Sequence, residues 1–509
     1  MHTKKDAKEE VRAEKDAYDT VSYPSFPYPD THPDRLAVMA ILHGLAPAPV
    51  DRCRVLEIAC NEGANLIPMG YAIPGSKFVG FDLARLPIER GQTRIRDLAM
   101  TNVRLFESDL LDVGSELGQF DYIIAHGLYA WVPEPVRDRL LALCRELLTS
   151  HGVAFVSYNA LPGGHLRKMI REMMLCHVQR IEDPEEKVTG ALAFLRFIVE
   201  ARAPGDAFRL LIEEQLKQMQ KRSPEAIYHD ELSAIHHPLH FSEFVEHARG
   251  HGLQYLSESV LPPPTDPRFR SDLQPALESA AGDDIIAQEQ VLDFVRMRMY
   301  RETLLCRAEC KVCHDIPAEA FSKLFFASQA TTSPGQAPGA QIFTLPGGIR
   351  MESSHAGTIT LMEQLANAWP CALSFAEIES TLVASGLAGA GAVNGEGATL
   401  LMRLAVAKMI ELHAWRAPVA PQISARPRAS ASARQEARTR AHATTLLHTT
   451  LRLEDPIVRS FLRLLDGTRD RDTLFGALKT EFPAMPREQL EQGIEPSLKL
   501  LHRAGLLEA

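Results

Sequence analysis

The sequence predicts an α/β fold in which a doubly wound parallel sheet occupies the first third of the chain. Five short segments rich in branched and aromatic residues alternate with helical stretches, which is the pattern of βα repeats. The predicted strands are Arg54–Cys60, Lys77–Leu83, Asn102–Leu110, Phe120–Leu128 and Gly152–Leu161. The predicted helices between them are Ala64–Ala72, Arg85–Met100 and Pro135–Ser150. Ligands of such sheets bind at the carboxyl ends of the strands, so a site is expected there.

Size and composition indicate a globular chain with several domains. Its 509 residues correspond to about three domains of typical size. The net charge of −10 disfavours nucleic acid as a partner, because proteins that bind it carry a basic face. The sequence contains no uninterrupted run of about 18 apolar residues, so we expect no membrane span. The charged N-terminus lacks the apolar segment of a signal peptide. Eight cysteines without regular spacing predict a reducing, cytoplasmic location.

Changes in pattern along the chain predict seven regions. After the fifth strand the pattern becomes almost wholly helical, one more strand follows at His251–Val260, and Asp283–Arg307 has the pattern of a long amphipathic helix. The predicted regions are an N-terminal arm or lid (1–46), the core (47–166), a helical insertion that could dimerise (167–238), a return to the core sheet (239–262), a middle domain (283–417), a flexible basic linker (418–440) and a C-terminal helical domain (441–509).

The loop after the first strand carries the strongest signal for a ligand. The acidic Glu57 is followed by a tight run of small residues around Cys60, with Ala59, Asn61 and Gly63 at alternate positions. Small residues let the backbone pass close under a ligand, with one or more of them at positive φ. A carboxylate, Asp82, ends the second strand about 20 residues after Gly63, where a βαβ unit places an acid beside a ribose. The spacing therefore predicts a site for a cofactor that contains adenosine.

The pattern of this loop resembles motif I of the class I S-adenosylmethionine (SAM) methyltransferases. Their usual form is an acid followed by three glycines at alternate positions, whereas Ala59 and Asn61 replace two of these glycines here. The G-x-G-x-x-G fingerprint of dinucleotide-binding loops is absent, because Ala59, Asn61 and Ala64 stand at its positions. The resemblance implies SAM as the cofactor.

Further residues at strand ends are expected to contact the same cofactor. Asp82, followed by Leu83, can accept hydrogen bonds from both ribose hydroxyls, and Asp109, between Ser108 and Leu110, can accept one from the adenine amino group. Each aspartate could instead only cap the helix or turn that follows it. Glu57 lies on an apolar strand, and its burial without a partner would be costly, so we expect a ligand or a backbone partner for it.

Longer segments resemble the bacterial methyltransferases that carry a methyltransferase regulatory domain, among them the rickettsial protein-lysine methyltransferases. The matching segments lie at Tyr18–Leu36, Asn65–Leu83, Ile123–Cys144, Val156–Gly164, Tyr228–Glu258 and Leu464–Leu474. The resemblance implies a Rossmann-like SAM-binding core, a helical or dimerising insertion, a middle regulatory domain and a C-terminal domain of winged-helix character. It also implies a protein lysine as one methyl acceptor.

The segment after the fourth strand supplies candidates for the acceptor pocket. His126 and Gly127 are expected to contact the cofactor, and His126 is the first choice for a general base. Tyr129 and Trp131 could enclose a lysine side chain and offer aromatic faces to a methylated ammonium. The alternative for these two aromatic residues is packing under the helix that follows.

The N-terminal arm could fold over the cofactor as a lid. It carries Tyr18, Tyr23 and His32, which would line the covered site. Packing of these side chains against the core is an equally good interpretation.

Cys306, Cys310 and Cys313 have the spacing of an iron–sulfur loop, and Cys313 precedes a histidine as in a haem attachment sequence. The three cysteines follow a predicted helix late in the chain, which does not suit either cofactor. Free thiols are therefore the expectation, with no metal.

Three hypotheses about function remain at this point. The first is a cytoplasmic SAM-dependent methyltransferase that acts on a protein lysine. The second is a methyltransferase for a small molecule. The third is a catalytically silent protein with the same fold that serves as an interaction module, because Ala59 and Asn61 depart from the motif.

Overall fold

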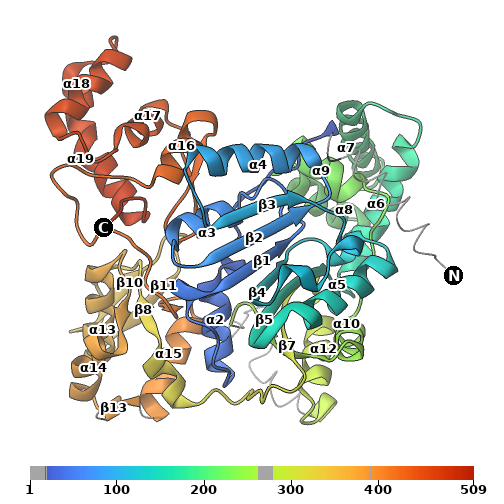
Figure 1. Cartoon of the computed structure of the whole chain (residues 1–509), viewed down its shortest axis with the longest axis horizontal. Coiled ribbons are helices and arrows are strands. Elements are labelled where there is room, and N and C mark those ends of the chain that lie inside the picture. Colours follow the sequence, from blue (N-terminus) through green and yellow to red (C-terminus); the bar gives the residue numbers. More distant parts are fainter. Residues whose placement is uncertain (1–17, 19, 262–278, 390–391, 394) are drawn as a thin grey trace.

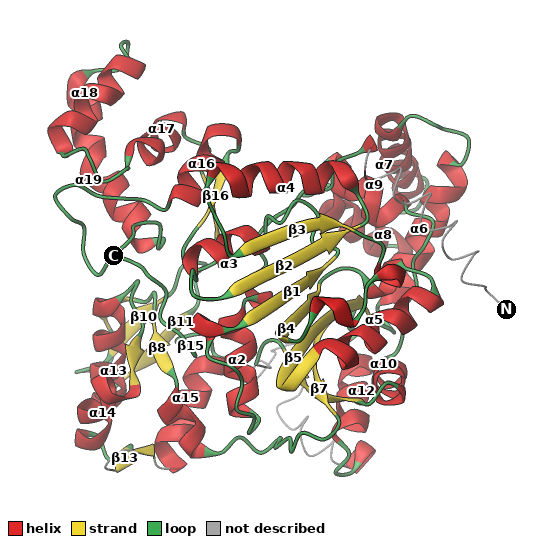
Figure 2. Ribbon diagram, in the orientation of Figure 1, coloured by secondary structure: helices red, strands yellow, loops and turns green. Residues whose placement is uncertain are grey.

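The computed structural model describes residues 18, 20–261, 279–389, 392–393 and 395–509. A twisted central sheet lies in the middle, with helices on both of its faces, and further domains lie at its two ends (Figures 1 and 2). Within the described residues no helix combines the length and the apolar character that crossing a membrane requires.

The central sheet has seven strands in the order β3-β2-β1-β4-β5-β7-β6. Strands β1 to β5 are parallel, whereas β7 runs antiparallel to both of its neighbours. The strands are β1 (Arg54–Ile58), β2 (Lys77–Asp82), β3 (Val103–Glu107), β4 (Phe120–Ala125), β5 (Leu148–Asn159), β6 (Leu253–Glu258) and β7 (Tyr300–Arg307). The predicted Rossmann-like, doubly wound core is thereby confirmed, with all five predicted parallel strands present.

Alternate residues of each strand pack into separate cores on the two faces of the sheet. Val55 and Phe78 belong to one apolar cluster, and Leu56 and Phe81 belong to the other. A strand buried on both faces must be apolar at almost every position, which explains the continuous apolar runs in the sequence. The helices that cover the faces are α2 (Pro33–Leu42), α3 (Leu66–Ala72), α4 (Arg85–Asp97), α5 (Glu134–Leu147), α10 (Phe241–Gly250) and α12 (Ile285–Arg296).

The single helix predicted over Asp283–Arg307 is wrong in its second half. Helix α12 ends at Arg296, and Met297 adopts a left-handed conformation with φ of 48°. The chain then reverses and enters the sheet as β7, which pairs with β5 so that Tyr300 lies opposite Asn159. Strand pairing with β5 outweighs the local helical pattern. The start of β7 thus reaches the edge of the sheet at which the parallel strands end.

A helical insertion follows β5, as predicted. It consists of α6 (Gly164–Val178), α7 (Pro184–Glu200), α8 (Ala207–Met219) and α9 (Pro224–Leu232), which share an apolar core of their own. The sequence marks the helix starts well, because Asp183, Asp206 and Ser223 each accept a hydrogen bond from a backbone N–H of the first turn. In Figure 2 the arrowheads of β1, β2 and β3 point toward this insertion.

The middle of the chain forms short strands and helices beside the core (Figure 1). Its elements are β8 (Phe325–Ala327), β9 (Thr331–Pro334), β10 (Gln341–Thr344), β11 (Arg350–Ser353), α13 (Ala356–Ala368), β12 (Leu373–Ser374), α14 (Phe375–Ala384), β13 (Ala388–Gly389), β14 (Ala392–Val393), α15 (Gly395–Val406) and β15 (Glu411–His413). The C-terminal domain contains α16 (Ala431–Thr439), β16 (His442–Thr444), β17 (Thr450–Arg452), α17 (Pro456–Leu464), α18 (Arg471–Glu481) and α19 (Arg487–Arg503). The β16–β17 hairpin among these helices agrees with the predicted winged-helix character.

The flexible basic linker predicted over 418–440 is a structured segment instead. Its second half is α16, whose small Ser432, Ala433 and Ala437 side chains are buried in the C-terminal domain. Glu436 is also buried and forms an ion pair with Arg94 of α4. Low-complexity composition misleads here, because alanine and serine allow close helix packing that a sequence-based reading takes for flexibility.

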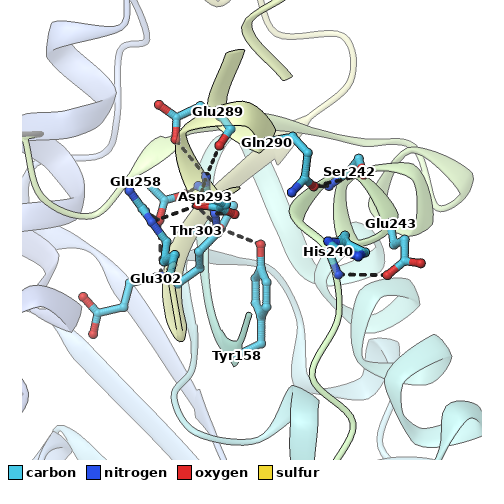
Figure 3. A network of polar contacts seen from close by, with 12 residues as sticks. Tyr158, His240, Ser242, Glu243, Glu258, Glu289, Gln290, Asp293, Glu302 and Thr303 are labelled. Carbon is cyan, nitrogen blue, oxygen red and sulfur yellow. Dashed lines mark hydrogen bonds and ion pairs between the residues drawn. The ribbon is translucent and has the colours of Figure 1, made fainter. Parts of the chain in front are cut away.

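A buried ionic network fixes β7 in the sheet (Figure 3). The Arg301 side chain is fully buried, and it donates to Asp293 of α12 and to Glu258 of β6, with nitrogen–oxygen distances of 2.7–2.9 Å. Glu289 receives a further hydrogen bond, at 2.9 Å. A buried arginine must be paired because the loss of its hydration is costly, so each partner constrains the position of β7.

A second buried cluster joins the N-terminal arm to the middle domain. Asp34 of α2 accepts hydrogen bonds from Nδ1 of His413 at 2.7 Å and from the backbone N–H groups of Ala414 and Trp415 at 2.6 and 2.9 Å. Burial alone would lower the pKa of His413, but the carboxylates of Asp34 and Glu411 raise it to about 9. The imidazolium is therefore charged at neutral pH and holds the arm against β15.

This ion pair should make stability depend on pH. Because the folded pKa of His413 is raised, its stabilising effect is complete below the unfolded value near 6.5 and is lost as the pH rises through about 9. We predict that His413→Gln lowers the free energy of unfolding by on the order of 3 kcal/mol at pH 6, and by much less at pH 10. Urea unfolding of both proteins across this range measures the difference, and a difference that does not change with pH would contradict the assignment.

Candidate functional site

A cavity of about 390 Å³ lies over the carboxyl ends of the parallel strands. The strand ends, the N-terminal arm, the helical insertion and the start of β7 all contribute to its lining. This is the edge of the sheet at which open α/β folds bind their ligands. The predicted cofactor residues that line it are Glu57, Ala59, Cys60, Asn61, Asp82, Leu83, Ser108, Asp109, Leu110, His126 and Gly127.

The loop after β1 has the conformation that its motif implies. Ala59, Asn61 and Gly63 adopt positive φ angles of 59°, 50° and 69°. Glycine is required at the third position, because a Cβ atom on Gly63 would lie 2.7 Å from Leu105 Cδ1. Gly63 itself does not line the cavity. The first two positions tolerate other residues at the cost of backbone strain, which is larger for alanine than for asparagine.

Asp82 holds this loop in place. One carboxylate oxygen accepts a hydrogen bond from the backbone N–H of Asn61 at 2.8 Å, and the other accepts one from the backbone N–H of Ala84 at 2.9 Å. Asp82 therefore joins the end of β2 to the loop after β1 while it lines the cavity. Of the roles considered from the sequence, holding the turn before α4 and a place at the ligand edge both apply to Asp82, whereas the helix itself is capped by Ala84 without a side-chain hydrogen bond.

Glu57 is the most unusual titratable group of the cavity. Its Oε1 accepts a hydrogen bond from Asn65 Nδ2 at 2.8 Å, whereas its buried Oε2 has no partner among the described residues. Burial raises the pKa of Glu57 to about 8, the hydrogen bond from Asn65 opposes this shift, and the nearby Asp82 adds to it. At neutral pH the carboxyl is mostly protonated, and it offers an unused oxygen to a ligand.

The end of β3 contributes one acidic residue, Asp109, to the cavity. Asp109 lines the cavity, and its Oδ1 also accepts a hydrogen bond from the backbone N–H of Leu111 at 2.9 Å. It thus caps the short turn over Leu110–Asp112. Ser108 and Leu110 line the cavity on either side of it.

Aromatic side chains surround His126 at the end of β4. Tyr28 of the arm stacks on the His126 ring with centroids 3.8 Å apart, and the Tyr300 hydroxyl lies 3.2 Å from its Nε2. Burial lowers the pKa of His126 to about 4, so the imidazole is neutral at pH 7. A base with so low a pKa accepts a proton poorly, which favours a role for His126 in the cavity wall over the expected role of general base.

Two of the expected acceptor and lid residues lie away from the cavity lining. The Tyr129 hydroxyl lies 2.6 Å from Nδ1 of His247 on α10, and the Tyr129 ring is buried. Tyr129 therefore packs inside the core and does not line the cavity, as the alternative to an acceptor role expects. His32 caps α2 and packs against Trp415 and His448.

Trp131 does line the cavity, but its ring already contacts two cations. The guanidinium groups of Arg167 and Arg171 on α6 lie 5.3 and 5.1 Å from the ring centroid. The expected cation–π role is thus occupied by the chain's own arginines. The lid residues Tyr18 and Tyr23 line the cavity as expected, and Tyr18 stacks on His229 of α9 at 4.2 Å.

Several cavity residues are not among the candidates predicted from the sequence. They include Tyr28, Asn65, Asp230 and Tyr300. Tyr300 carries no signal in the sequence, because the pattern of its segment is helical. Asn159, which the sequence places at the ligand edge because it ends the fifth predicted strand, does line the cavity. It resembles Glu57 in one respect, because its buried Oδ1 has no partner among the described residues.

Asn65 connects the loop after β1 to distant parts of the chain. Besides donating to Glu57, it accepts hydrogen bonds through Oδ1 from the backbone N–H of Tyr28 at 2.9 Å and from His448 Nε2 at 2.8 Å. His448 belongs to the C-terminal domain. The arm and the C-terminal domain therefore meet at the residue that positions Glu57.

The three clustered cysteines are free thiols in different surroundings. Cys306 is buried in β7, and burial raises its pKa. Cys310 and Cys313 donate to the carbonyl oxygens of Ser150 and Asp315.

Three family models match parts of the chain. Residues 56–154 match a methyltransferase domain, residues 223–307 match a predicted methyltransferase regulatory domain, and residues 425–485 match the PKMT C-terminal winged helix domain. The region that matches the regulatory domain lies earlier in the chain than the middle regulatory domain predicted at 283–417, and the two regions share only residues 283–307. It covers α9, α10, β6, α12 and β7, so it is the part that completes the central sheet.

The chain is also similar to proteins of Rickettsia. It is 31% identical to the uncharacterised protein RP789 of Rickettsia prowazekii over 314 residues, which are 61% of this chain and 56% of RP789. It is 34% identical to RP028 of the same organism over 239 residues, which are 47% of this chain and 96% of RP028. The structure of PKMT2 from Rickettsia typhi in complex with AdoHcy superposes with a TM-score of 0.84 at 24% identity, covering 95% of this chain and 99% of PKMT2.

The strain at Ala59 leads to a testable prediction. An alanine in the left-handed conformation destabilises the folded protein by about 1–2 kcal/mol, and glycine avoids this cost. Glycine also makes the unfolded chain more flexible, which lowers the free energy of unfolding by about 0.4–1 kcal/mol. Ala59→Gly should therefore raise the Tm of thermal unfolding by about 1 °C. The matched Ala37→Gly, at a buried position in the middle of helix α2, should lower it. Equal losses in the two variants would show that the loop is not strained.

Proposed function

We propose that a protein lysine is the methyl acceptor of this chain, which belongs to the SAM-dependent methyltransferases that carry a methyltransferase regulatory domain. The observation that carries the proposal is a pair of buried oxygen atoms in one cavity that have no hydrogen-bond partner in the part of the chain that the structure describes. Glu57 Oε2 lies where a cationic cofactor is expected, and Asn159 Oδ1 lies where an amine acceptor is expected.

At the cofactor end, three carboxyl groups suit the adenosine and the positive charges of SAM. We assign the ribose hydroxyls to Asp82, because each of its oxygens can accept a second hydrogen bond besides the one from the backbone. Asp109, with Ser108 and Leu110 beside it, is assigned to the adenine. Glu57 is assigned to the amino group of the methionine part, since its unpaired Oε2 needs a donor.

At the acceptor end, Asn159 and Tyr300 lie side by side on paired strands. An amine nitrogen can donate one hydrogen bond to Asn159 Oδ1. That bond then fixes the direction in which the nitrogen lone pair points. Trp131, fixed by the arginines of α6, and Tyr28, stacked on His126, would enclose the methylene groups of a lysine. An enclosed aromatic channel also keeps water from the reacting atoms.

The reaction needs positioning and deprotonation of the amine more than a strong base. Bound SAM would supply an electrophilic methyl group and leave as S-adenosylhomocysteine. The lysine nitrogen must first release its proton to solvent, and a buried channel beside a sulfonium lowers the lysine pKa from about 10.4. The residues of the channel then hold the nitrogen about 3–3.5 Å from the methyl carbon, in line with the bond that breaks.

Two observations favour a protein over a small molecule as the acceptor. The match to a PKMT C-terminal winged helix domain is typical of protein-lysine methyltransferases, the class that this abbreviation denotes. Tyr18, Tyr23 and Asp230 line the cavity from the arm and the helical insertion, so its outer part is built from segments outside the core that a polypeptide could contact. A cytoplasmic location and pairing of two copies through the insertion stay predictions.

Methyl transfer to lysate proteins tests this proposal. With SAM labelled in its methyl group, we expect the label in the protein fraction, on lysine after mass spectrometry, and not in the small-molecule fraction. Asn159→Ala should lower kcat/KM for the acceptor by about 100-fold, since it removes a group that positions the nucleophile, and should leave the Kd for SAM within about threefold.

The exposed Glu225 of α9 provides the control, and Glu225→Gln should methylate as the unchanged protein does. Label only in small molecules would refute the lysine acceptor. An Asn159→Ala variant with unchanged kcat/KM would refute the assignment of the acceptor end.

The raised pKa of Glu57 predicts proton release on cofactor binding. With a pKa of about 8 the carboxyl is mostly protonated at pH 7, and a cationic amino group beside it favours the ionised form. Binding of SAM at pH 7 should therefore release close to one proton per site, and Glu57→Gln should abolish the release. Calorimetric titrations in buffers of different ionisation enthalpy measure it, and equal release by both proteins would remove Glu57 from the cofactor site.

A further inference from the structure

A histidine pair and an aspartate meet on the outer face of the core, away from the cavity. His247 lies in the last turn of α10, His251 follows as the residue that caps this helix, and Asp138 faces them from α5. Residues four apart lie on the same side of a helix, so both imidazoles face Asp138. Figure 1 shows α5 and α10 on the same side of the sheet.

The donor atoms are almost at the spacing of metal ligands. Asp138 Oδ1 lies 2.9 Å from Nε2 of His251 and 3.5 Å from Nε2 of His247. One ligand atom from each of the three residues lies within 4.8 Å of the other two. Tetrahedral Zn²⁺ with bonds of about 2.0–2.1 Å places neighbouring ligand atoms about 3.3 Å apart. Small side-chain rotations would therefore suffice to enclose an ion.

The backbone that carries these donors is firmly held. On α10, Phe244, Val245 and Ala248 are fully buried, and on α5, Leu140 and Leu141 are fully buried. Since both helices are fixed by the same core, the three donors meet without any ordering of loops. A metal site built on rigid elements loses little entropy on binding.

A buried tyrosine orients one of the ligands from behind. The Tyr129 hydroxyl lies 2.6 Å from Nδ1 of His247, and only 1% of the Tyr129 residue surface is exposed. With Nδ1–H donated to this oxygen, the Nε2 lone pair of His247 is directed outward to the ion. Metal-binding histidines characteristically donate their second ring N–H in this way.

We propose that Asp138, His247 and His251 form a binding site for a divalent transition-metal ion of the Zn²⁺ type. The protein supplies two imidazoles and one carboxylate, and water completes the coordination at the exposed Asp138 side. Two nitrogen donors and one oxygen donor select Zn²⁺ or Co²⁺ over Mg²⁺ and Ca²⁺, which prefer oxygen ligands alone.

This ion would have an effect on the cavity through one short turn. Tyr129 and Trp131 belong to the same 3₁₀ turn, η5 (Tyr129–Trp131), with Tyr129 directed to His247 and Trp131 lining the cavity. An ion that fixes His247 also fixes Tyr129, and thereby the turn that carries Trp131. The site joins α5 to α10 and supports one wall of the acceptor end.

Titration of the metal-free full chain with Co²⁺ tests this site. The exposed Cys176 and Cys313 are competing ligands, so the titration uses a Cys176→Ser/Cys313→Ser background. We expect one Co²⁺ per chain with a micromolar or tighter Kd, the visible absorption bands of a four- or five-coordinate ion, and displacement by Zn²⁺. His251→Ala and Asp138→Ala should each weaken the Kd at least tenfold, with unchanged circular dichroism as the check of folding.

Two further variants separate this site from adventitious binding. Tyr129→Phe keeps every ligand but removes the hydroxyl behind His247, and should weaken Co²⁺ binding by about 10-fold or more. His151→Ala removes an exposed histidine elsewhere and should leave the Kd unchanged. Absence of Co²⁺ binding below 100 µM, or equal Kd values in the His251→Ala and unchanged proteins, would overturn the proposal. These readouts do not depend on methyl transfer.

Discussion

The hydrogen bonds of one carboxylate, Asp82, hold the candidate site together. One of them joins the end of β2 to the strained loop after β1, through the backbone N–H of Asn61. The other fixes the turn between β2 and α4, through the backbone N–H of Ala84. Because the loop lacks two of the glycines typical of its motif, an acceptor at this point stabilises a conformation that Ala59 resists. The cavity, the exposure of Glu57 to it and the proposed place of the ribose all follow from the position of this loop.

Segments outside the parallel sheet complete the site. The buried Arg301 network fixes the antiparallel β7, and β7 brings Tyr300 beside Asn159. The N-terminal arm reaches the same cavity, where Asn65 binds both the arm and His448 of the C-terminal domain. The core thus supplies the strand-end residues of the cavity, whereas the rest of the lining comes from β7, the arm and the insertion. Such a lining suits the protein acceptor that we propose.

The sequence predicts well which residues at the strand ends line the cavity and predicts poorly the residues of the proposed acceptor end, for a physical reason. Carboxylates that end parallel strands must share one edge of the sheet, so local pattern alone brings Glu57, Asp82 and Asp109 together. The position of Tyr300 depends on pairing between strands far apart in the chain, and its local pattern is helical. The composition of helix α16 is that of flexible chains, so the sequence predicts a linker where the structure has a packed helix. The sequence also suggests Tyr129 for the acceptor wall, because it does not show which way a side chain in a short turn points.

The most direct test of this account is a crystal structure of the full chain with S-adenosylhomocysteine. Both ribose hydroxyls should lie about 3 Å from the Asp82 carboxylate, and the amino group should lie at hydrogen-bond distance from Glu57 Oε2. A ligand bound elsewhere, or a cavity that stays empty at millimolar ligand, would contradict it.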